Sequence, residues 1–274
     1  EMPRPFGVFY LEDRMLYEEA LVGQIEEAKK MSDYGASAIV VLPTEPVLSG
    51  KFISSPVFDN ATKSFIFDQN NEYFNLSTTA VENLSGSFTL MGFCKQGNTG
   101  APHQTVIGTA TGYRNGAKLM SRYHGQAAFW VGNNDGTDSY LLGSGVDITN
   151  DGQWHHIAVS GGGAGGNITL YIDGILIPAA TSPIAFTGSY ADSDYDLQIG
   201  NWEHTAHGML GGMADFRIYN NELSSLDISN LYNGTNITTD LIGHWLIDSD
   251  DVIDHAGTNN GTNFGSVYST DSPS

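Results

Sequence analysis

The sequence predicts a mainly β protein: a two-sheet antiparallel β-sandwich of jelly-roll type that follows a short α-helical segment. From Val57 onward, short runs of alternating apolar and polar residues are separated by turns rich in Gly, Asn and Asp. The 274 residues include 33 glycines, and 40% are hydrophobic, enough for a packed core. Many short strands with regular turn signals are typical of sandwiches and jelly rolls.

Residues 1–43 are predicted to form a strand–helix–strand attachment segment. Apolar residues recur at helical spacing between Arg14 and Ser32, and acidic residues near its start and lysines near its end suit the helix dipole. Short apolar strands are expected on either side. Residues 44–56, which contain prolines and a glycine, are predicted to be a linker.

Residues 57–274 are predicted to form the sandwich. The Asp173-Gly174 pair between two apolar runs is the strongest hairpin signal in the chain. One short helix is expected from Ser224 to Tyr232, with Ser224 as its N-cap, Asp227 three residues later, and Gly234 ending it. The expected strands are 64–67, 87–91, 105–107, 118–121, 127–131, 154–159, 168–172, 197–199 and 213–219.

Charge and cysteine content exclude several classes of function. The chain has 11 Lys and Arg against 31 Asp and Glu, a formal charge of −20. So negative a surface disfavours nucleic acid as a partner. The single cysteine, Cys94, rules out an internal disulfide and a cysteine-based metal site. We expect no membrane span, since no run of eighteen apolar residues occurs.

Five segments resemble the laminin-G-like, concanavalin A-like lectin family in their order and spacing. The resemblance covers roughly residues 58–262. It implies two antiparallel sheets with a concave face, often used for glycans or protein partners, and often a calcium ion at the rim. The matching segments are 64–74, 151–159, 170–174, 199–200 and 212–232.

The C-terminal segment departs from the family pattern. A segment like 241–262 usually precedes the first strands of this family, whereas here it follows the short helix. Either it closes the same sandwich in permuted order or it begins a second module. Closure is favoured, because an orphan strand carrying Trp245 and Leu246 would leave an apolar edge unpaired.

The N-terminal segment, from Pro3 to Lys29, resembles the C-terminal tail of 2-oxoacid:ferredoxin oxidoreductase β subunits. The resemblance includes none of that family's thiamine-diphosphate or cluster-binding motifs. A helix that serves as an oligomerisation element or attaches the chain to virion or surface proteins is the more economical interpretation.

Catalysis is not expected. Sandwich glycosidases place paired carboxylates on one strand, about 5 Å apart, and no such motif occurs in the sequence. Asp215 lies in a family-like strand with Arg217 two residues later, which favours a structural ion pair. His155 and His156 would point to opposite faces of a strand, one of them into the core.

The predicted ligand site lies mainly in the loop after residue 200. Trp202 offers an apolar face for stacking on a pyranose ring, and the imidazoles of His204 and His207 offer hydrogen bonds. Tyr140 and Tyr195 complete the predicted set. An ordinary loop with a half-buried tryptophan is the alternative.

Calcium is the candidate cofactor, since two loops space side-chain oxygens in a way that suits a hard cation. Solvated turns are the alternative. The predicted ligands are Asp135, Asp138, Asp192, Asp194 and Asp196.

The resulting hypothesis is a non-catalytic module that recognises glycans or surface glycoconjugates. Its expected location is an extracellular surface or a virion, as in a fibre or adhesin. The alternatives are an assembly module without sugar affinity and a polysaccharide-cleaving enzyme.

Overall fold

The computed structural model describes thirteen stretches of the chain, all of them within the compact unit Pro56–Ser274. The other unit, Glu1–Ser55, holds the predicted attachment segment and nearly all of the predicted linker, which therefore lie outside the described residues. The described stretches are 63–69, 71–76, 86–96, 103–109, 117–124, 126–132, 139–144, 151–162, 166–177, 184–185, 196–201, 208–247 and 249–273.

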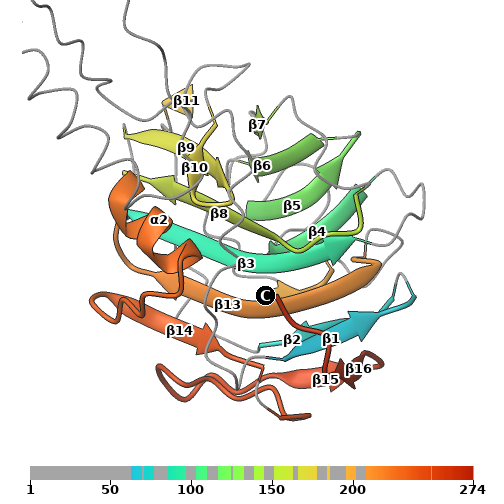
Figure 1. Ribbon diagram of the computed structural model, residues 1–274. Coiled ribbons are helices and arrows are strands. Elements are labelled where there is room, and N and C mark those ends of the chain that lie inside the picture. Colours follow the sequence, from blue (N-terminus) through green and yellow to red (C-terminus); the bar gives the residue numbers. More distant parts are fainter. Residues whose placement is uncertain are drawn as a thin grey trace, which may run out of the picture. The chain divides into compact units, whose positions relative to one another are not determined.

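The strands form two antiparallel sheets of nine and seven strands (Figure 1). The nine-stranded sheet runs β10 (Ile175–Leu176), β9 (Asn167–Ile172), β8 (His155–Gly161), β3 (Phe88–Gln96), β13 (Gly211–Tyr219), β1 (Ser64–Phe67) and β16 (Val267–Ser269), with β11 (Ile184–Ala185) on β9 and β14 (Leu241–Trp245) on β13. The seven-stranded sheet runs β15 (Thr262–Phe264), β2 (Tyr73–Asn75), β12 (Gln198–Ile199), β4 (His103–Gly108), β5 (Ala117–Tyr123), β6 (Gln126–Gly132) and β7 (Ser139–Gly143).

The main core lies between the two sheets and takes its side chains from both. Alternation along each strand sends every second side chain inward, as Phe65 and Phe67 of β1 and Phe129 and Val131 of β6 illustrate. These side chains are at most 1% exposed. The predicted mainly β sandwich of jelly-roll type is confirmed.

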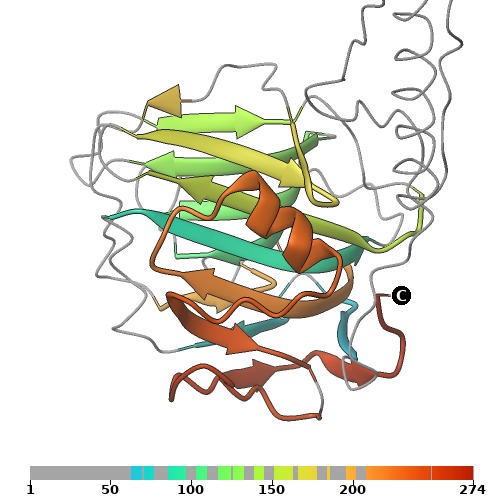
Figure 2. The ribbon, with the colours of Figure 1, turned by 60° about the vertical axis from the view of Figure 1, so that its left-hand side comes forward.

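A second apolar cluster lies on the outer face of the nine-stranded sheet, beneath helix α2 (Ser225–Tyr232). Ile228 and Leu231 of α2 pack there against β3, β8, β9 and β13, and Figure 2 shows the helix crossing this face. The predicted cap is confirmed: Ser224 and Asp227 form a reciprocal capping box. Within the described stretches, no helix has the length and hydrophobicity that a membrane span requires.

The C-terminal segment contributes strands to both sheets. β14 pairs with β13, and β15 and β16 form the outer strands beside β2 and β1. β1 and β14 occupy opposite ends of the same edge of β13, since β1 pairs with residues 211–213 and β14 with residues 216–219. Trp245 of β14 is wholly buried in the main core. Strands β14, β15 and β16 are therefore hydrogen-bonded members of the two sheets.

The predicted hairpin is present between β9 and β10. Asp173 and Gly174 form its two-residue turn, with φ values of 52° and 73°. Positive φ at both turn positions is what the type I′ turn requires, and it is why an Asp-Gly pair is favoured there.

Strand β3 is longer than the sequence predicts, because Gly92 does not end it. A Cβ atom at position 92 would lie 2.8 Å from Cδ1 of Phe216, a buried side chain of β13. The glycine therefore makes room for a neighbouring aromatic ring, and the strand continues to Gln96.

Candidate functional site

An aromatic pair lies at the edge of the seven-stranded sheet, where β2 pairs with the outer strand β15. Phe74 points into the core, so the alternation of β2 places Tyr73 on the outer face. Phe264 lies opposite Tyr73 in the register, and the rings stack with centroids 4.6 Å apart and planes 9° apart. Phe264 is 43% exposed and Tyr73 is half-buried, so the pair presents aromatic surface to solvent.

The pair borders a hollow of about 500 Å³, which we call the β2–β15 hollow. Besides the two rings, its described lining residues are Gln69, Asn71, Glu72 and Gly265. The amide side chains of Gln69 and Asn71 are exposed, so each offers hydrogen-bond donors and an acceptor. An apolar platform beside neutral polar groups is characteristic of small-ligand sites.

Two local features fix the shape of this hollow. The Glu72 carboxylate accepts hydrogen bonds from the backbone N–H groups of Asp68, at 2.6 Å, and Gln69, at 3.2 Å, which holds the turn before β2. Gly265 has a φ of 99°, and a Cβ atom there would lie 3.0 Å from Cγ of Glu72. The chain can therefore make this turn beside Glu72 only because residue 265 is a glycine.

A second hollow, of about 600 Å³, lies beside the same C-terminal segment, and we call it the β16 hollow. Tyr268 of β16 is half-buried there and packs edge-on against Phe65, with ring centroids 5.8 Å apart. The lining residues are Phe65, Ser249, Asp250, Asn263, Ser266, Val267 and Tyr268.

A row of paired residues crosses the outer face of the seven-stranded sheet. Asn75, Gln198, Gly108, Lys118 and Trp130 lie opposite one another on successive strands. The Lys118 Nζ atom is 4.3 Å from the ring centroid of Trp130, a cation–π contact, and both side chains are buried.

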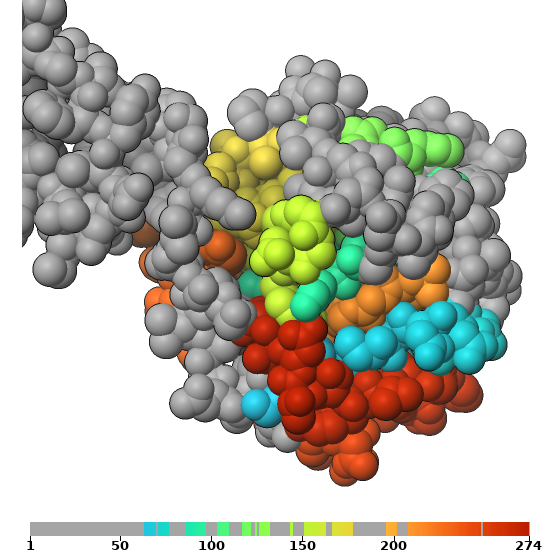
Figure 3. All heavy atoms as spheres, turned by 45° about the vertical axis from the view of Figure 1, so that its right-hand side comes forward, coloured from blue at the N-terminus to red at the C-terminus, as the bar shows by residue number. Residues whose placement is uncertain are grey.

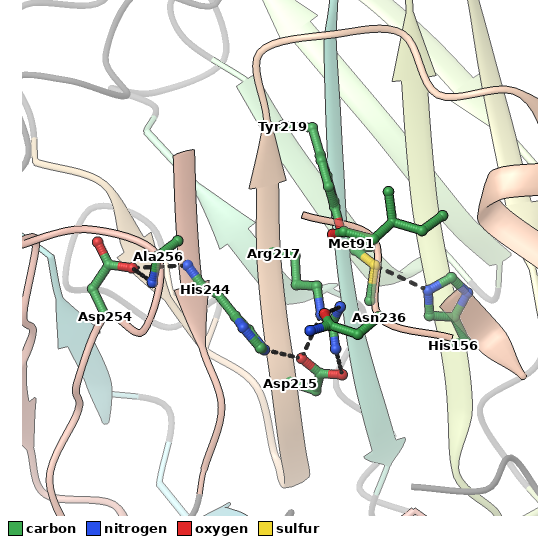
Figure 4. Close-up of polar contacts among 10 residues, drawn as sticks. Met91, His156, Asp215, Arg217, Tyr219, Asn236, His244, Asp254 and Ala256 are labelled. Atoms are coloured by element: carbon green, nitrogen blue, oxygen red, sulfur yellow. Dashed lines mark hydrogen bonds and ion pairs between the residues drawn. The ribbon is translucent and has the colours of Figure 1, made fainter. Parts of the chain in front are cut away.

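A buried polar network lies on the nine-stranded sheet, mainly on β13 and β14 (Figure 4). Asp215 accepts hydrogen bonds from Arg217 and, at 2.8 Å, from Nε2 of His244. The predicted Asp215–Arg217 ion pair is confirmed. Burial alone would raise the pKa of Asp215, but the guanidinium and the imidazole hold it well below its ordinary value. The polar groups of this network bond to one another, from strands and a nearby loop. This arrangement favours a structural role for the network.

The neighbouring histidines of β8 have opposite environments, as predicted. The side chain of His156 is fully buried, and its Nε2 lies 3.5 Å from the sulfur of Met91. His155 faces two carboxylates: its Nδ1 is 2.8 Å from Asp173 and its Nε2 is 3.2 Å from Asp151.

The predicted ligand and calcium residues lie largely outside the described residues. This holds for Trp202, His204, His207, Tyr195, and the aspartates 135, 138, 192 and 194. Tyr140 lies in β7, where its backbone pairs with Val131. Asp196 is described, and its Oδ2 accepts a 2.8 Å hydrogen bond from the amide of Asn75. Among the described stretches, no three His, Cys, Asp or Glu side chains group so as to hold a metal ion.

The stacked pair at the edge of the sheet was not predicted. Tyr73 falls within a segment used for the family resemblance, but nothing in the sequence links it to Phe264. The two are 191 positions apart and are joined only by the register of β2 with β15.

The two antiparallel sheets define a jelly-roll β-domain. Residues 68–229 match the family model described as the concanavalin A-like lectin/glucanases superfamily, and the chain belongs to that superfamily. Comparison with curated protein sequences gives no match.

Solved structures share the fold at low sequence identity. A Bacteroides ovatus protein described as a candidate carbohydrate-binding protein is 17% identical, with a TM-score of 0.57 over 76% of this chain. The chain spans 60% of the length of that protein. The heptameric SAP-like pentraxin of Limulus polyphemus is 12% identical, with a TM-score of 0.52 over 78% of this chain and 97% of its own. The carbohydrate-binding module CBM40 of the Ruminococcus gnavus IT-sialidase is 15% identical, with a TM-score of 0.52 over 63% of this chain and 97% of its own.

Proposed function

We propose that this protein is a non-catalytic carbohydrate-binding module and that it binds glycans at the β2–β15 hollow. The observation that carries the proposal is the stacked, partly exposed pair of Tyr73 and Phe264 beside exposed amides. Membership in a superfamily of lectins and glucanases and the names of two structural neighbours add support.

The chemistry of the hollow suits a sugar ring. A pyranose has an apolar face of C–H groups, which packs on an aromatic ring, and a rim of hydroxyl groups, which needs donors and acceptors. Tyr73 and Phe264 supply the aromatic surface, and the amides of Gln69 and Asn71 supply hydrogen bonds of both kinds. The Glu72 carboxylate is engaged by two backbone N–H groups, so we assign it a role in shaping the hollow.

A glycan-array screen of the purified chain tests the proposal, followed by titration of the best glycan. Tyr73→Ala and Phe264→Ala should each weaken binding about tenfold or more, the loss of one aromatic contact. Leu226→Ala is the matched control, because Leu226 is an exposed apolar residue on α2, with 68% exposure. Binding that survives both aromatic substitutions would place the site elsewhere, and Trp202→Ala and His204→Ala would then test the predicted loop.

Calcium is part of the same proposal, as a structural helper at the predicted aspartates. Asp196, the described member, engages one carboxylate oxygen with Asn75 and keeps lone pairs for a cation. The screen is therefore run with calcium and with a chelator, together with the thermal midpoint in both buffers. A midpoint that calcium does not move would remove the ion from the proposal.

A further inference from the structure

We infer that the bound glycan is neutral and extended, and that it spans the β2–β15 hollow and the β16 hollow across the turn at Gly265 and Ser266. This inference rests on the proposed function and deepens it, because it names the class of ligand and a second subsite.

The two hollows are separated by only a few residues of the same segment. Phe264 lines the first, and Ser266 and Val267 line the second. Three residues of extended chain span at most about 10 Å, which limits the distance between the Cα atoms of Phe264 and Val267. Because Asn263 lies opposite the core residue Phe74 and Phe264 lies opposite Tyr73, a ligand that enters both hollows passes around the outer strand β15 at this turn. Figure 3 shows the C-terminal residues, in red, against the first described strands, in cyan, on one face of the molecule.

The wall between the hollows is rigid. Asn263 Oδ1 accepts hydrogen bonds from the backbone N–H of Ser266, at 3.1 Å, and from its hydroxyl, at 2.8 Å. Asn263 Nδ2 donates in return to the carbonyl oxygen of Ser266, at 2.9 Å. The turn is thus held by three reciprocal bonds, so a ligand lying across it would not bear the cost of ordering it.

Each hollow is large enough to hold a sugar residue. Their volumes, about 500 and 600 Å³, fall within the usual range for small-molecule sites of about 300–1,000 Å³. The β16 hollow, like its neighbour, combines apolar surface with polar groups. Val267 is 61% exposed, and Tyr268 presents a half-buried ring. A ligand longer than a disaccharide would therefore make apolar contacts on both sides of the turn.

The charge of the two linings selects a neutral ligand. Among the described lining residues, Glu72 and Asp250 are the carboxylates, and none is a Lys, Arg or His. A uronate or sialylated glycan would bring a negative charge toward these carboxylates, with no cation among the described lining residues to balance it. The formal charge of −20 for the whole chain acts in the same direction.

An array of neutral gluco-, manno-, galacto- and xylo-oligosaccharides, from one to six residues long, tests the inference beside uronate-containing and sialylated glycans. Binding should be confined to a neutral series, and the tetrasaccharide should bind at least tenfold more tightly than the monosaccharide. The affinity should change little between low and high salt, because no charge pair forms. Equal or tighter binding of charged glycans, or affinity independent of length, would overturn the inference. Absence of binding to every glycan would instead overturn the proposed function.

Val267→Asp separates the two hollows. It places a charge in the β16 hollow, so the tetrasaccharide should fall to the affinity of the disaccharide while disaccharide binding stays unchanged. Leu226→Asp is the matched control, since it alters an apolar residue of similar exposure, 68% against 61%, on a different element. Tetrasaccharide binding that is unaffected by Val267→Asp would confine the site to the β2–β15 hollow.

Discussion

The guanidinium of Arg217 donates two parallel hydrogen bonds to the carboxylate of Asp215, from Nε at 2.9 Å and from Nη2 at 3.0 Å. The two residues are two positions apart on β13, at an irregularity where Asp215 adopts a φ of 47°. Both are nearly inaccessible to solvent, so neither charge can be satisfied by water if its partner is lost. The bulge and the ion pair therefore depend on each other.

Asp215→Asn should destabilise the protein by about 3–5 kcal/mol, because it leaves the Arg217 charge buried without its partner. Asparagine is the informative replacement, since it tolerates positive φ and nearly preserves the volume of the side chain. Denaturant unfolding measures the change. Asn236→Ala is the control: it removes one part-buried hydrogen bond to Arg217 and should cost only about 1 kcal/mol. Equal losses of unfolding free energy in the two variants would contradict the prediction that the ion pair contributes more than the hydrogen bond to Asn236.

His156 should make the protein less stable as the pH falls from about 6.5 to 4. Burial is the main cause that lowers its pKa, to about 4 in the folded chain, against about 6.5 when unfolded. Within this window the unfolded chain binds a proton that the folded chain does not, so acid favours unfolding. Across this pH window the free energy of unfolding should fall by about 3 kcal/mol.

Unfolding measured from pH 4 to 6.5 checks this prediction, with His156→Gln as the test and His255→Gln as an exposed control. His156→Gln should flatten the pH profile of stability, and the control should not. A profile unchanged by His156→Gln would contradict the assignment to His156.

His155 acts in the opposite direction. Burial lowers its pKa, but Asp173 and Asp151 outweigh burial and raise it. The stabilising contribution of His155 is complete at pH values below its unfolded pKa and is lost as the pH rises through its folded pKa.

The sequence predicts the elements better than the site, for a physical reason. Alternating strands, the Asp173-Gly174 turn and the Ser224 cap depend on residues a few positions apart, and each is present as expected. The stacking of Tyr73 with Phe264 depends on which strands become neighbours, and no local pattern encodes that pairing. Arg217 was predictable as a partner of Asp215, whereas His244 reaches the same carboxylate only through the pairing of β13 with β14.

Gly92→Ala should destabilise the protein by about 1–3 kcal/mol, the usual cost of overpacking a core. The added Cβ would lie 2.8 Å and 3.0 Å from two ring atoms of Phe216, whose side chain is fully buried. Gly86→Ala, just before β3, is a matched control because a Cβ atom there has nothing within 4 Å. Thermal unfolding of both variants measures the difference. Similar midpoints would mean that the Phe216 ring can move aside.

Trp245→Ala tests whether the C-terminal segment stabilises the whole sandwich. The Trp245 side chain is completely buried in the main core, and its indole N–H donates a 2.9 Å hydrogen bond to the carbonyl oxygen of Asn259. Removing it should cost about 3–5 kcal/mol, as for other large core aromatics. Ile253→Ala, at a 38% exposed position of the same segment, should cost far less.

The shape of the unfolding transition separates the two interpretations of this segment. If residues 241–269 close the sandwich, the loss of Trp245 shifts a single cooperative transition, since the core loses contacts from both sheets at once. If they formed an independent module, the variant would show an early, separate transition while the remaining domain unfolded at its original midpoint. The pairing of β14 with β13, β15 with β2 and β16 with β1 leads us to expect the single transition, because the segment's strands join both sheets.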